Sequence, residues 1–599
     1  MSHADETAAA RRQRKARTRA TAACSTCRGR RTRCDNQRPS CGFCRNNGLD
    51  CHYDQTPQQP PSRVEVELAA IKQRLDDITT RLPPPATIHH APPSQDFTPN
   101  SGHHAGHHVP ITEEEKSPFQ LLGIERTMTS LGLEPGFAEA LLQLERSPPV
   151  HASAQTSRMR IMQQQTVLDA LAAFSAHIHP FYSVFRPGFS QRHLQVMSGP
   201  LSPSCESFLS LVVTAVGVAA SQDFAFGSAT SDASAVNFVD AAMSSLPDVV
   251  VDSGLISVQC LLLLSIYYCC TLQPCRAYDY VVIASLKVQN LMKSQASQDD
   301  ELAEQVRRAF WALLLLECEL RAQFDRVGSR IQYQDDDVAL PDGRRPWHLE
   351  TEVGSPQESI SPTMSMHSMA SNELDTTQSY FLAEIAMRRM LNRCNTAIRR
   401  TSDGHIVYAP AIAVELELQL DNWYTCLPPA IRFDYHQDLD FDLLTSPSLY
   451  PRTDNLGNFL RVQYYCCKIS IYWPAAYQCI QDGIVTLELL QHCERFFNAY
   501  IQLMPSILMA VRECMVHRWT LYASIFMTSM AVLKAASTVG IRQGCAIDWS
   551  RLVHCLQSTQ RVDQRIAKGS GSLSLLSETL SERLRDFLET HAEGVDGYV

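Results

Sequence analysis

Apolar residues recur every three to four positions through most of the chain beyond residue 119. This spacing is typical of amphipathic helices, and no alternating run of strand length with hairpin punctuation interrupts it. The pattern therefore predicts a mainly α protein whose residues 119–599 form a large all-α domain. Helices are expected at 206–220, 254–272, 277–295, 302–324, 376–401, 410–426, 456–475, 485–504 and 515–536, with a Ser- and Met-rich loop at roughly 350–375.

A narrower pattern precedes this domain and predicts a short coiled coil at residues 64–82. Its apolar positions alternate in steps of four and three residues, which is the a/d seam of a heptad repeat. A capping box, Ser62-x-x-Glu65, begins the helix, and Pro83-Pro84-Pro85 ends it. A helix packed on its own domain would show a wider apolar stripe, so we expect a dimerisation helix. The seam residues are Val64, Leu68, Ile71, Leu75, Ile78 and Leu82.

One uncharged run, Ser253 to Cys275, is long enough to span a membrane. It contains Gln259, Gln273 and Pro274 together with several Ser, Thr and Cys residues. Such a composition favours a core helix that is buried on all sides over a helix in lipid. We therefore expect no membrane as a partner of this protein.

Charge is unevenly distributed along the chain. Residues 1–54 contain 12 Lys and Arg against 5 Asp and Glu; because the whole chain carries −10, the remainder carries −17. A small basic region on a large acidic body is typical of a nucleic-acid-binding protein with an appended partner domain. Residues 1–23 are expected to be a disordered basic arm, and the run Arg11 to Arg19 indicates a nuclear-entry signal, a phosphate-binding arm or a solvated charged tail. Without an apolar secretory segment at its start, the protein is expected to stay inside the cell. Together with the possible nuclear-entry signal, this gives the nucleus as the expected location.

Two further segments are expected to be linkers. Residues 55–63 are rich in Pro and Gln, and residues 83–118 combine few apolar residues with Pro, Ser and repeated His. The second composition is typical of a disordered chain. Its paired histidines could bind a metal weakly, but they are more typical of a solvated low-complexity tract.

Six of the 21 cysteines form two copies of the unit C-x2-C-x6-C, joined by six residues. Structural zinc prefers thiolate and takes four ligands, so six thiolates satisfy two zinc ions when two of them bridge both metals. The internal symmetry predicts a bridging pair at equivalent positions in the two copies. A disulfide knot, a redox-active C-x-x-C motif and a single-zinc site are the alternatives; the intracellular setting, the lack of a βαβ pattern and the regular repeat argue against them. The six are Cys24, Cys27, Cys34, Cys41, Cys44 and Cys51.

The stretches Ala23–Asp35 and Arg38–Cys44 closely resemble the DNA-binding domain of the fungal Zn2Cys6 binuclear-cluster transcription factors. Pro39 matches a proline with which the family shapes the loop between the two copies. The resemblance implies that Cys24 and Cys41 bridge the two zinc ions. Cys27 and Cys34 would complete one zinc site, and Cys44 and Cys51 the other.

The same resemblance implies how DNA is read. In the family, a short helix after the second cysteine presents basic residues to the major groove. Arg30 and Arg31 match the positions that approach base edges, commonly in a CGG triplet, where an arginine can bond guanine O6 and N7. The phosphate contacts, which set register without reading sequence, are expected to be Arg28, Arg33 and Arg38.

Part of the large domain resembles the fungal-specific middle homology domain of the same family, which regulates activity. The matching stretches are His179–Phe185, Ser257–Gln259, Arg307–Trp311 and Val338–Pro341. The family often has Asp-Arg shortly after the Phe-Trp pair. Glu317-Cys318-Glu319 stands there in this chain, and the nearest Asp-Arg is Asp325-Arg326.

We predict that the protein is not an enzyme, because it lacks a His-Glu-x-x-His motif, a Walker-type phosphate loop and a Gly-x-Ser-x-Gly elbow. The predicted function is sequence-specific binding of double-stranded DNA as a homodimer with two zinc ions, to regulate RNA polymerase II transcription through the transcription machinery or co-regulators. A zinc-cluster scaffold, or an RNA-binding regulator without duplex specificity, is the alternative. The sequence leaves open the target genes, the half-site orientation and spacing, the sign of regulation and any small-molecule effector.

Overall fold

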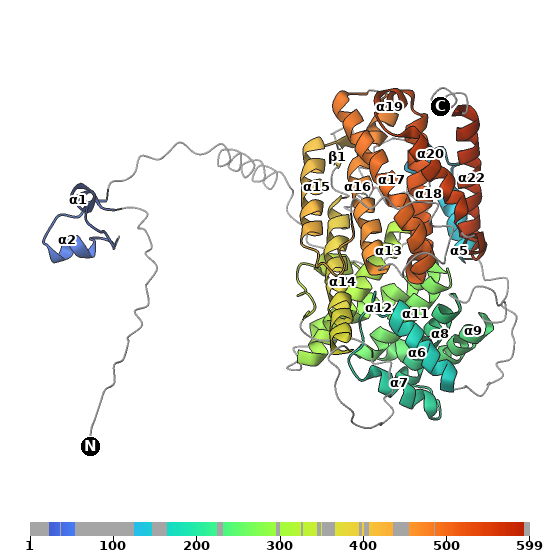
Figure 1. The fold of residues 1–599 in the computed structure, drawn as a ribbon. Coiled ribbons are helices and arrows are strands. Elements are labelled where there is room, and N and C mark those ends of the chain that lie inside the picture. Colours follow the sequence, from blue (N-terminus) through green and yellow to red (C-terminus); the bar gives the residue numbers. More distant parts are fainter. Residues whose placement is uncertain are drawn as a thin grey trace, which may run out of the picture. The chain divides into compact units, whose positions relative to one another are not determined.

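The computed structural model divides the chain into two compact units, residues 1–108 and 109–599 (Figure 1). It describes residues 23–35, 37–53, 125–146, 164–223, 232–294, 300–324, 327–343, 349, 366–394, 398–400, 406–434, 455–483, 485–562 and 564–591. The predicted basic arm up to residue 22, both predicted linkers and the predicted dimerisation helix at 64–82 lie outside these residues. The first unit contains two short helices, α1 (Ser25–Gly29) and α2 (Gly42–Asn46).

The described part of the second unit is built from helices in two groups (Figure 1). The first group follows two leading helices and comprises α6 to α13, in which α8 and α11 pack together and α12 lies between α11 and α13. The leading helices and this group are α4 (Glu125–Ser130), α5 (Phe137–Arg146), α6 (Gln164–His177), α7 (Phe189–Ser198), α8 (Cys205–Asp223), α9 (Asp232–Met243), α10 (Leu246–Val251), α11 (Leu255–Cys270), α12 (Pro274–Ser294), α13 (Asp300–Phe324) and the 3-10 turn η3 (Ile331–Gln334).

In the second group, α16, α17, α18 and α22 lie side by side, and α5 from the start of the unit packs against α22 (Figure 1). Its elements are α14 (Met366–Cys394), β1 (Ile398–Arg400), β2 (Ile406–Tyr408), α15 (Pro410–Thr425), α16 (Asn455–Asp482), α17 (Leu487–Glu513), η5 (Met515–His517), α18 (Arg518–Ser537), α19 (Val539–Gly544), α20 (Trp549–Ser558), η6 (Thr559–Arg561), α21 (Gln564–Lys568) and α22 (Gly571–His591).

The prediction of a mainly α fold is confirmed, and every helix predicted within residues 119–599 overlaps an observed one. Four boundaries were wrong. α16 ends at Asp482 and α17 at Glu513, beyond the predicted ends at 475 and 504. The other two lie at the two ends of α14. The helix expected to reach residue 401 ends at Cys394, and β1 follows it, paired antiparallel with β2 through Arg399 and Val407. The Asp403-Gly404 dipeptide between the strands is a hairpin signal. The prediction followed the helical pattern of the preceding residues and did not use this signal.

The other wrong boundary of α14 concerns the loop expected at roughly 350–375. α14 already begins at Met366, so the last third of that stretch is helical. Its Met, Ala, Glu and Leu residues are good helix formers, and their propensity prevailed over the Ser-rich composition.

The uncharged run lies in α11 and is a core helix, as predicted, since every residue from Ser257 to Cys270 is buried. Within the described ranges, no single helix is long and apolar enough to cross a membrane. α17 and α18 pass that test only as a pair bent by 108°.

The four stretches that resemble the middle homology domain meet in pairs. The Gln259 side chain donates to the Val184 carbonyl at 3.0 Å, and the Trp311 indole donates to the Ala339 carbonyl at 3.0 Å. Glu317 accepts hydrogen bonds from the backbone and the hydroxyl of Ser329, both at 2.7 Å. Glu317 therefore holds the chain that leaves α13, whereas the Glu319 carboxylate lies 2.9 Å from Nδ1 of His517.

α6 and α8 cross closely at Gly217, which permits this packing because it lacks a side chain. A Cβ atom at this position would lie 2.0 Å from the backbone oxygen of Ala170 on α6. Backbone cannot move aside as a flexible side chain can, so even a methyl group would force the two helices apart.

We therefore expect Gly217→Ala to lower the free energy of unfolding by about 1–3 kcal/mol, despite the better helix propensity of alanine. Thermal unfolding of the full chain, followed by circular dichroism, measures this loss. Ser221→Ala, on the same helix and exposed, is the control and should change little. A Gly217→Ala variant as stable as the parent would show that the helices do not approach this closely.

Candidate metal centre and nucleic-acid interface

The two cysteine units fold as near copies of each other. Each places its first cysteine at a helix N-cap, where the sulfur accepts the backbone N–H of the second cysteine at 3.4 Å: Cys24 from Cys27 and Cys41 from Cys44. After each helix a backbone N–H five residues on closes the turn, from Thr32 to the Cys27 carbonyl and from Leu49 to the Cys44 carbonyl, both at 3.0 Å. The sequence repeat is therefore also a structural repeat.

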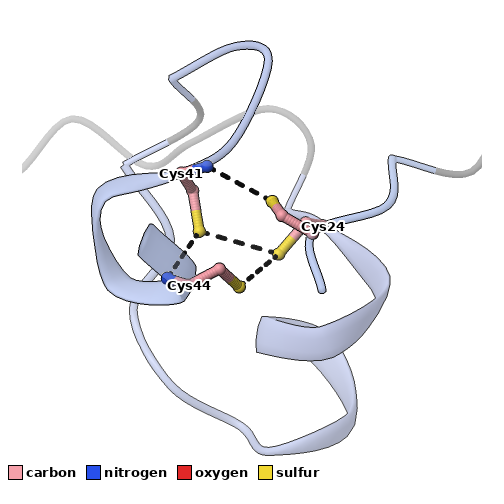
Figure 2. A group of neighbouring side chains, drawn as sticks. Cys24, Cys41 and Cys44 are labelled. Atoms are coloured by element: carbon pink, nitrogen blue, oxygen red, sulfur yellow. Dashed lines mark hydrogen bonds between the residues drawn. The ribbon is translucent and has the colours of Figure 1, made fainter. Parts of the chain in front are cut away.

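The six sulfur atoms gather into two overlapping groups of four. In each group the sulfurs lie within 4.8 Å of one another, and the two groups share Cys24 and Cys41, equivalent positions in the two copies. Figure 2 shows the sulfurs of Cys24, Cys41 and Cys44 pointing toward one another. The groups are Cys24, Cys27, Cys34 and Cys41, and Cys24, Cys41, Cys44 and Cys51.

The sulfur spacings fit tetrahedral zinc. A Zn–S bond of about 2.3 Å places two sulfurs of one tetrahedron about 3.8 Å apart. The Cys24 and Cys41 sulfurs are 3.8 Å apart, those of Cys24 and Cys44 3.7 Å, and those of Cys27 and Cys41 3.6 Å. The cysteines are buried except for Cys51, which is partly buried. Side chains packed at these distances can therefore hold two metal ions that share two sulfurs.

The electrostatics of the cysteines depend on local hydrogen bonds. The backbone N–H of Cys44 lowers the pKa of Cys41 to about 6, because it stabilises the thiolate. Burial raises the pKa of the Cys44 thiol, so a buried thiolate there requires a positive charge beside it. A zinc ion supplies that charge, since thiolates bind it in deprotonated form.

Asp35 was not singled out from the sequence, yet it joins the two copies. Its carboxylate oxygens accept the backbone N–H of Gly42, the first residue of α2, at 2.9 and 3.0 Å. This hydrogen bond lowers the pKa of Asp35. A Cβ atom on Gly42 would lie 2.5 Å from an Asp35 oxygen. The close approach of Asp35 therefore also favours a glycine at position 42. Only the position of Asp35 directly after Cys34 could have indicated this role.

Tyr53 was also missed by the sequence reasoning. Its hydroxyl donates to the Gln37 carbonyl at 3.0 Å, and the Arg38 guanidinium lies 5.0 Å from the centre of its ring. A cation over an aromatic face is attracted by the ring's negative face. Tyr53 therefore holds Arg38 and the loop between the copies; an aromatic residue just beyond the last cysteine was the available signal.

The basic residues around the cysteines are all exposed, but they differ in how they are held. Arg28 donates to the Ala23 carbonyl at 3.3 Å, and Arg45 donates to Gln37 and to the Ser40 carbonyl at 3.0 and 3.1 Å. Arg38 lies over the Tyr53 ring. The remaining three side chains make no hydrogen bond or ion pair with the part of the chain that the structure describes; they are Arg30, Arg31 and Arg33.

Arg31 has an unusual backbone. Its φ is 52°, and the equivalent residue of the second copy, Gly48, has φ of 60°. Glycine adopts this left-handed conformation freely, whereas other residues pay about 1–2 kcal/mol for it. The first copy thus keeps an arginine at a position where the fold favours glycine.

Comparison with known proteins identifies both units. Residues 22–60 match the fungal Zn(2)-Cys(6) binuclear cluster domain, and residues 171–425 match the fungal specific transcription factor domain. The domain match and the sulfur geometry together confirm two zinc ions as the cofactor. No solved structure matches the chain.

One relative extends the match over nearly the whole chain, and others match shorter parts of it. The chain is 40% identical to ecdB of Aspergillus rugulosus, which is named for an inferred role as a transcription factor, over 96% of this chain and 99% of that protein. It is 29% identical to the citrinin biosynthesis transcriptional activator mrl3 of Monascus ruber, over 21% of this chain and 27% of that protein. It is 39% identical to the asperfuranone cluster transcription factor afoA of Emericella nidulans, over 11% and 10% of the two chains. The protein belongs to the fungal transcription factors that carry a Zn(2)-Cys(6) binuclear cluster.

Proposed function

We propose that this protein binds double-stranded DNA sequence-specifically in the nucleus and regulates RNA polymerase II transcription. The observation that carries the proposal is a set of three exposed arginines, Arg30, Arg31 and Arg33, beside the gathered sulfurs. They have no hydrogen-bond or ion-pair partner among the described residues. Side chains that the fold leaves uncommitted, on a region with six arginines against two aspartates, are suited to a polyanion.

The zinc ligands are proposed as follows. Cys24 and Cys41 bridge the two ions because both groups of four sulfurs contain them. Each remaining pair belongs to one group and therefore binds one ion. These pairs are Cys27 and Cys34, and Cys44 and Cys51. Each zinc then has four sulfur ligands and no open position, the arrangement of a structural site.

The arginines divide into two proposed roles. Arg30 and Arg31, at the end of α1, read base edges in a CGG-like triplet, since an arginine there can bond guanine in bidentate fashion. Arg28, Arg33 and Arg38 contact phosphates. Arg28 contacts Ala23, and Arg38 contacts Tyr53. Because these contacts restrict where each guanidinium can reach, they support a role in positioning the protein on DNA and not in reading bases.

Dimerisation is proposed through residues 64–82, which lie outside the described residues. One triplet carries too little information for a genome-scale search, so two modules tied together are required. Twelve residues separate Cys51 from Val64, and each module can therefore reach at most about 40 Å from the coiled coil. The acidic second unit is proposed to contact the transcription machinery or co-regulators.

We expect Leu75→Pro to abolish any preference for paired over single triplets, because proline breaks the helix and its a/d packing. Electrophoretic mobility shifts with duplexes that carry one or two triplets at varied spacing measure the preference. Zinc content should be unchanged in the variant, which controls for damage to the first unit. A parent chain that binds as a monomer, or that ignores spacing, would refute the dimer.

The experiment that tests the function is selection of bound duplexes from a random pool by the full chain. We expect enrichment of a guanine-containing triplet in pairs, with one dominant spacing. A zinc-cluster scaffold or an RNA-binding regulator would enrich no duplex sequence, and for the latter a structured RNA would compete as well as duplex DNA.

A further inference from the structure

A buried cluster of charged side chains joins the two helical groups of the second unit, and DNA binding does not use it. Glu319 belongs to α13 of the first group. Glu384 and Arg388 belong to α14 and His517 to η5, all in the second group. The four side chains are only 5–13% exposed to solvent. The two groups therefore meet at charges that water barely reaches.

Glu319 links the two groups. One of its carboxylate oxygens lies 2.9 Å from Nδ1 of His517 and 3.8 Å from a guanidinium nitrogen of Arg388. The carboxylate also accepts a hydrogen bond from the hydroxyl of Thr520 in α18. An ionised carboxylate can only accept, so Nδ1 of His517 donates to it. Glu319 therefore holds η5 and α18 of the second group against α13 of the first.

Arg388 faces a second carboxylate. Oε1 of Glu384 lies 3.8 Å from the same guanidinium nitrogen that faces Glu319. It also accepts a hydrogen bond from the uncharged amide of Gln463 in α16 at 2.6 Å. In the part of the chain that the structure describes, no lysine and no other arginine forms an ion pair with either carboxylate. One guanidinium thus serves two carboxylates, and it can balance only one of them.

The surroundings of the cluster are aromatic and uncharged. The centroid of the His517 ring lies 4.4 Å from that of Phe459, 5.3 Å from that of Phe181 and 6.0 Å from that of Tyr182. Further titratable groups of the described chain face the cluster, and burial raises the pKa of each, so they carry no charge near neutral pH. They are Tyr182, Cys269, Cys318, Tyr380, Cys466 and Cys514.

The charges of the cluster balance only when it binds a proton. Two carboxylates and one guanidinium sum to −1, and an uncompensated charge in a buried site is costly. Burial raises the pKa of Glu384, although Arg388 acts against it. Burial also acts to raise the pKa of Glu319, but His517 and Arg388 outweigh it, and that pKa is lowered overall. Glu319 therefore stays ionised, and one proton on Glu384 or on the imidazole of His517 makes the cluster neutral.

We propose that this cluster is a pH-sensitive lock between the two helical groups. It binds one proton while Glu319, Arg388 and His517 hold the groups together, and release of that proton leaves a buried negative charge that weakens their contact. The proton passes to water or hydroxide, and no other covalent bond changes in this step. The packing of the second unit then responds to the pH around it. The lock does not involve the zinc cluster or DNA, so it stands or falls independently of the function proposed above.

The direction of the pH effect follows from the two carboxyl groups. The stability that Glu384 contributes is complete below its ordinary pKa of 4.5 and is lost as the pH rises through its raised pKa. Glu319 has the opposite sign, since its contribution is complete above 4.5 and is lost as the pH falls through its lowered pKa. Between about pH 5 and about pH 9 only the first loss occurs, so the lock should weaken as the pH rises.

The test follows thermal unfolding of the full zinc-loaded chain and its variants by circular dichroism between about pH 5 and about pH 9. Glu384→Gln keeps an acceptor for Gln463 and leaves a cluster that is neutral without a bound proton. We expect the melting temperature of the parent to fall by at least about 3 °C more than that of this variant across the range. Glu319→Gln also leaves a single carboxylate and should show the same flattened profile, whatever its absolute stability.

Glu415→Gln is the matched control, because Glu415 is an exposed carboxylate of α15 that accepts a hydrogen bond from Gln419 on the same helix. Its profile should follow that of the parent. Hydrogen–deuterium exchange at matched pH should locate the difference in η5, with exchange at least about threefold faster in the parent than in Glu384→Gln near pH 9. The lock is overturned if the parent, Glu384→Gln and Glu319→Gln lose melting temperature equally, if Glu415→Gln flattens the profile as well, or if η5 exchanges alike in parent and variant.

Discussion

Replacing Cys24 or Cys41 with alanine is expected to remove both zinc ions, whereas replacing Cys27 should disturb chiefly one. The reason is that both groups of four sulfurs contain the first two residues and only one contains Cys27. Structural zinc contributes about 10–16 kcal/mol to small domains, so loss of both ions should unfold the region around residues 23–53 and abolish specific DNA binding. Native mass spectrometry of the full chain counts the ions directly.

Cys426→Ala is the matched control, because Cys426 is an exposed cysteine of the second unit. It should retain two zinc ions. The bridged cluster would be contradicted by a parent chain with a single zinc, or by Cys24→Ala and Cys27→Ala variants that lose the same number of ions.

The second large effect is expected at Arg31, where substitution should weaken DNA binding without lowering the stability of the zinc module. Arg31→Ala and Arg31→Gly should each cost about 1–3 kcal/mol of binding free energy and flatten the preference at one guanine. Arg31→Gly should nevertheless leave the zinc module as stable as the parent, or up to about 1 kcal/mol more stable, because glycine relieves the left-handed φ of 52°. Fluorescence anisotropy with duplex DNA measures the first effect, and a chelator titration the second.

Arg45→Ala provides the comparison, since Arg45 donates to the loop residues Gln37 and Ser40 instead of lying free. It should lower the module's stability and leave base preference unchanged. If Arg31→Gly kept full base preference, the arginine would have another reason to occupy a position that favours glycine, and the proposed reading helix would be wrong.

The zinc centre could be predicted from sequence because its chemistry is encoded in spacing. Each copy of the unit places one cysteine at a helix N-cap, one inside the helix and one in the segment after it. The symmetry of the two copies restricts the bridging cysteines to a pair at equivalent positions. Asp35 and Tyr53 could not be predicted in this way. Each contacts residues that lie near it only after the loop from 34 to 41 has folded, and neither has a counterpart of the same type in the other copy.

In the second unit, helix periodicity predicted the elements but not their ends. The boundary at Cys394 depends on a hairpin whose strands are three residues long, too short to show an alternating pattern of their own.

In the proposed function, a two-zinc cluster presents Arg30, Arg31 and Arg33 to a specific duplex. One measurement tests it most directly: anisotropy titrations of the full chain, at one fixed salt concentration, with the selected duplex and with a shuffled duplex of the same composition. We predict at least about a hundredfold preference for the selected duplex, lost on chelation of zinc and restored by two equivalents of the ion. Equal affinity for the two duplexes, or a preference that survives chelation, would contradict the account.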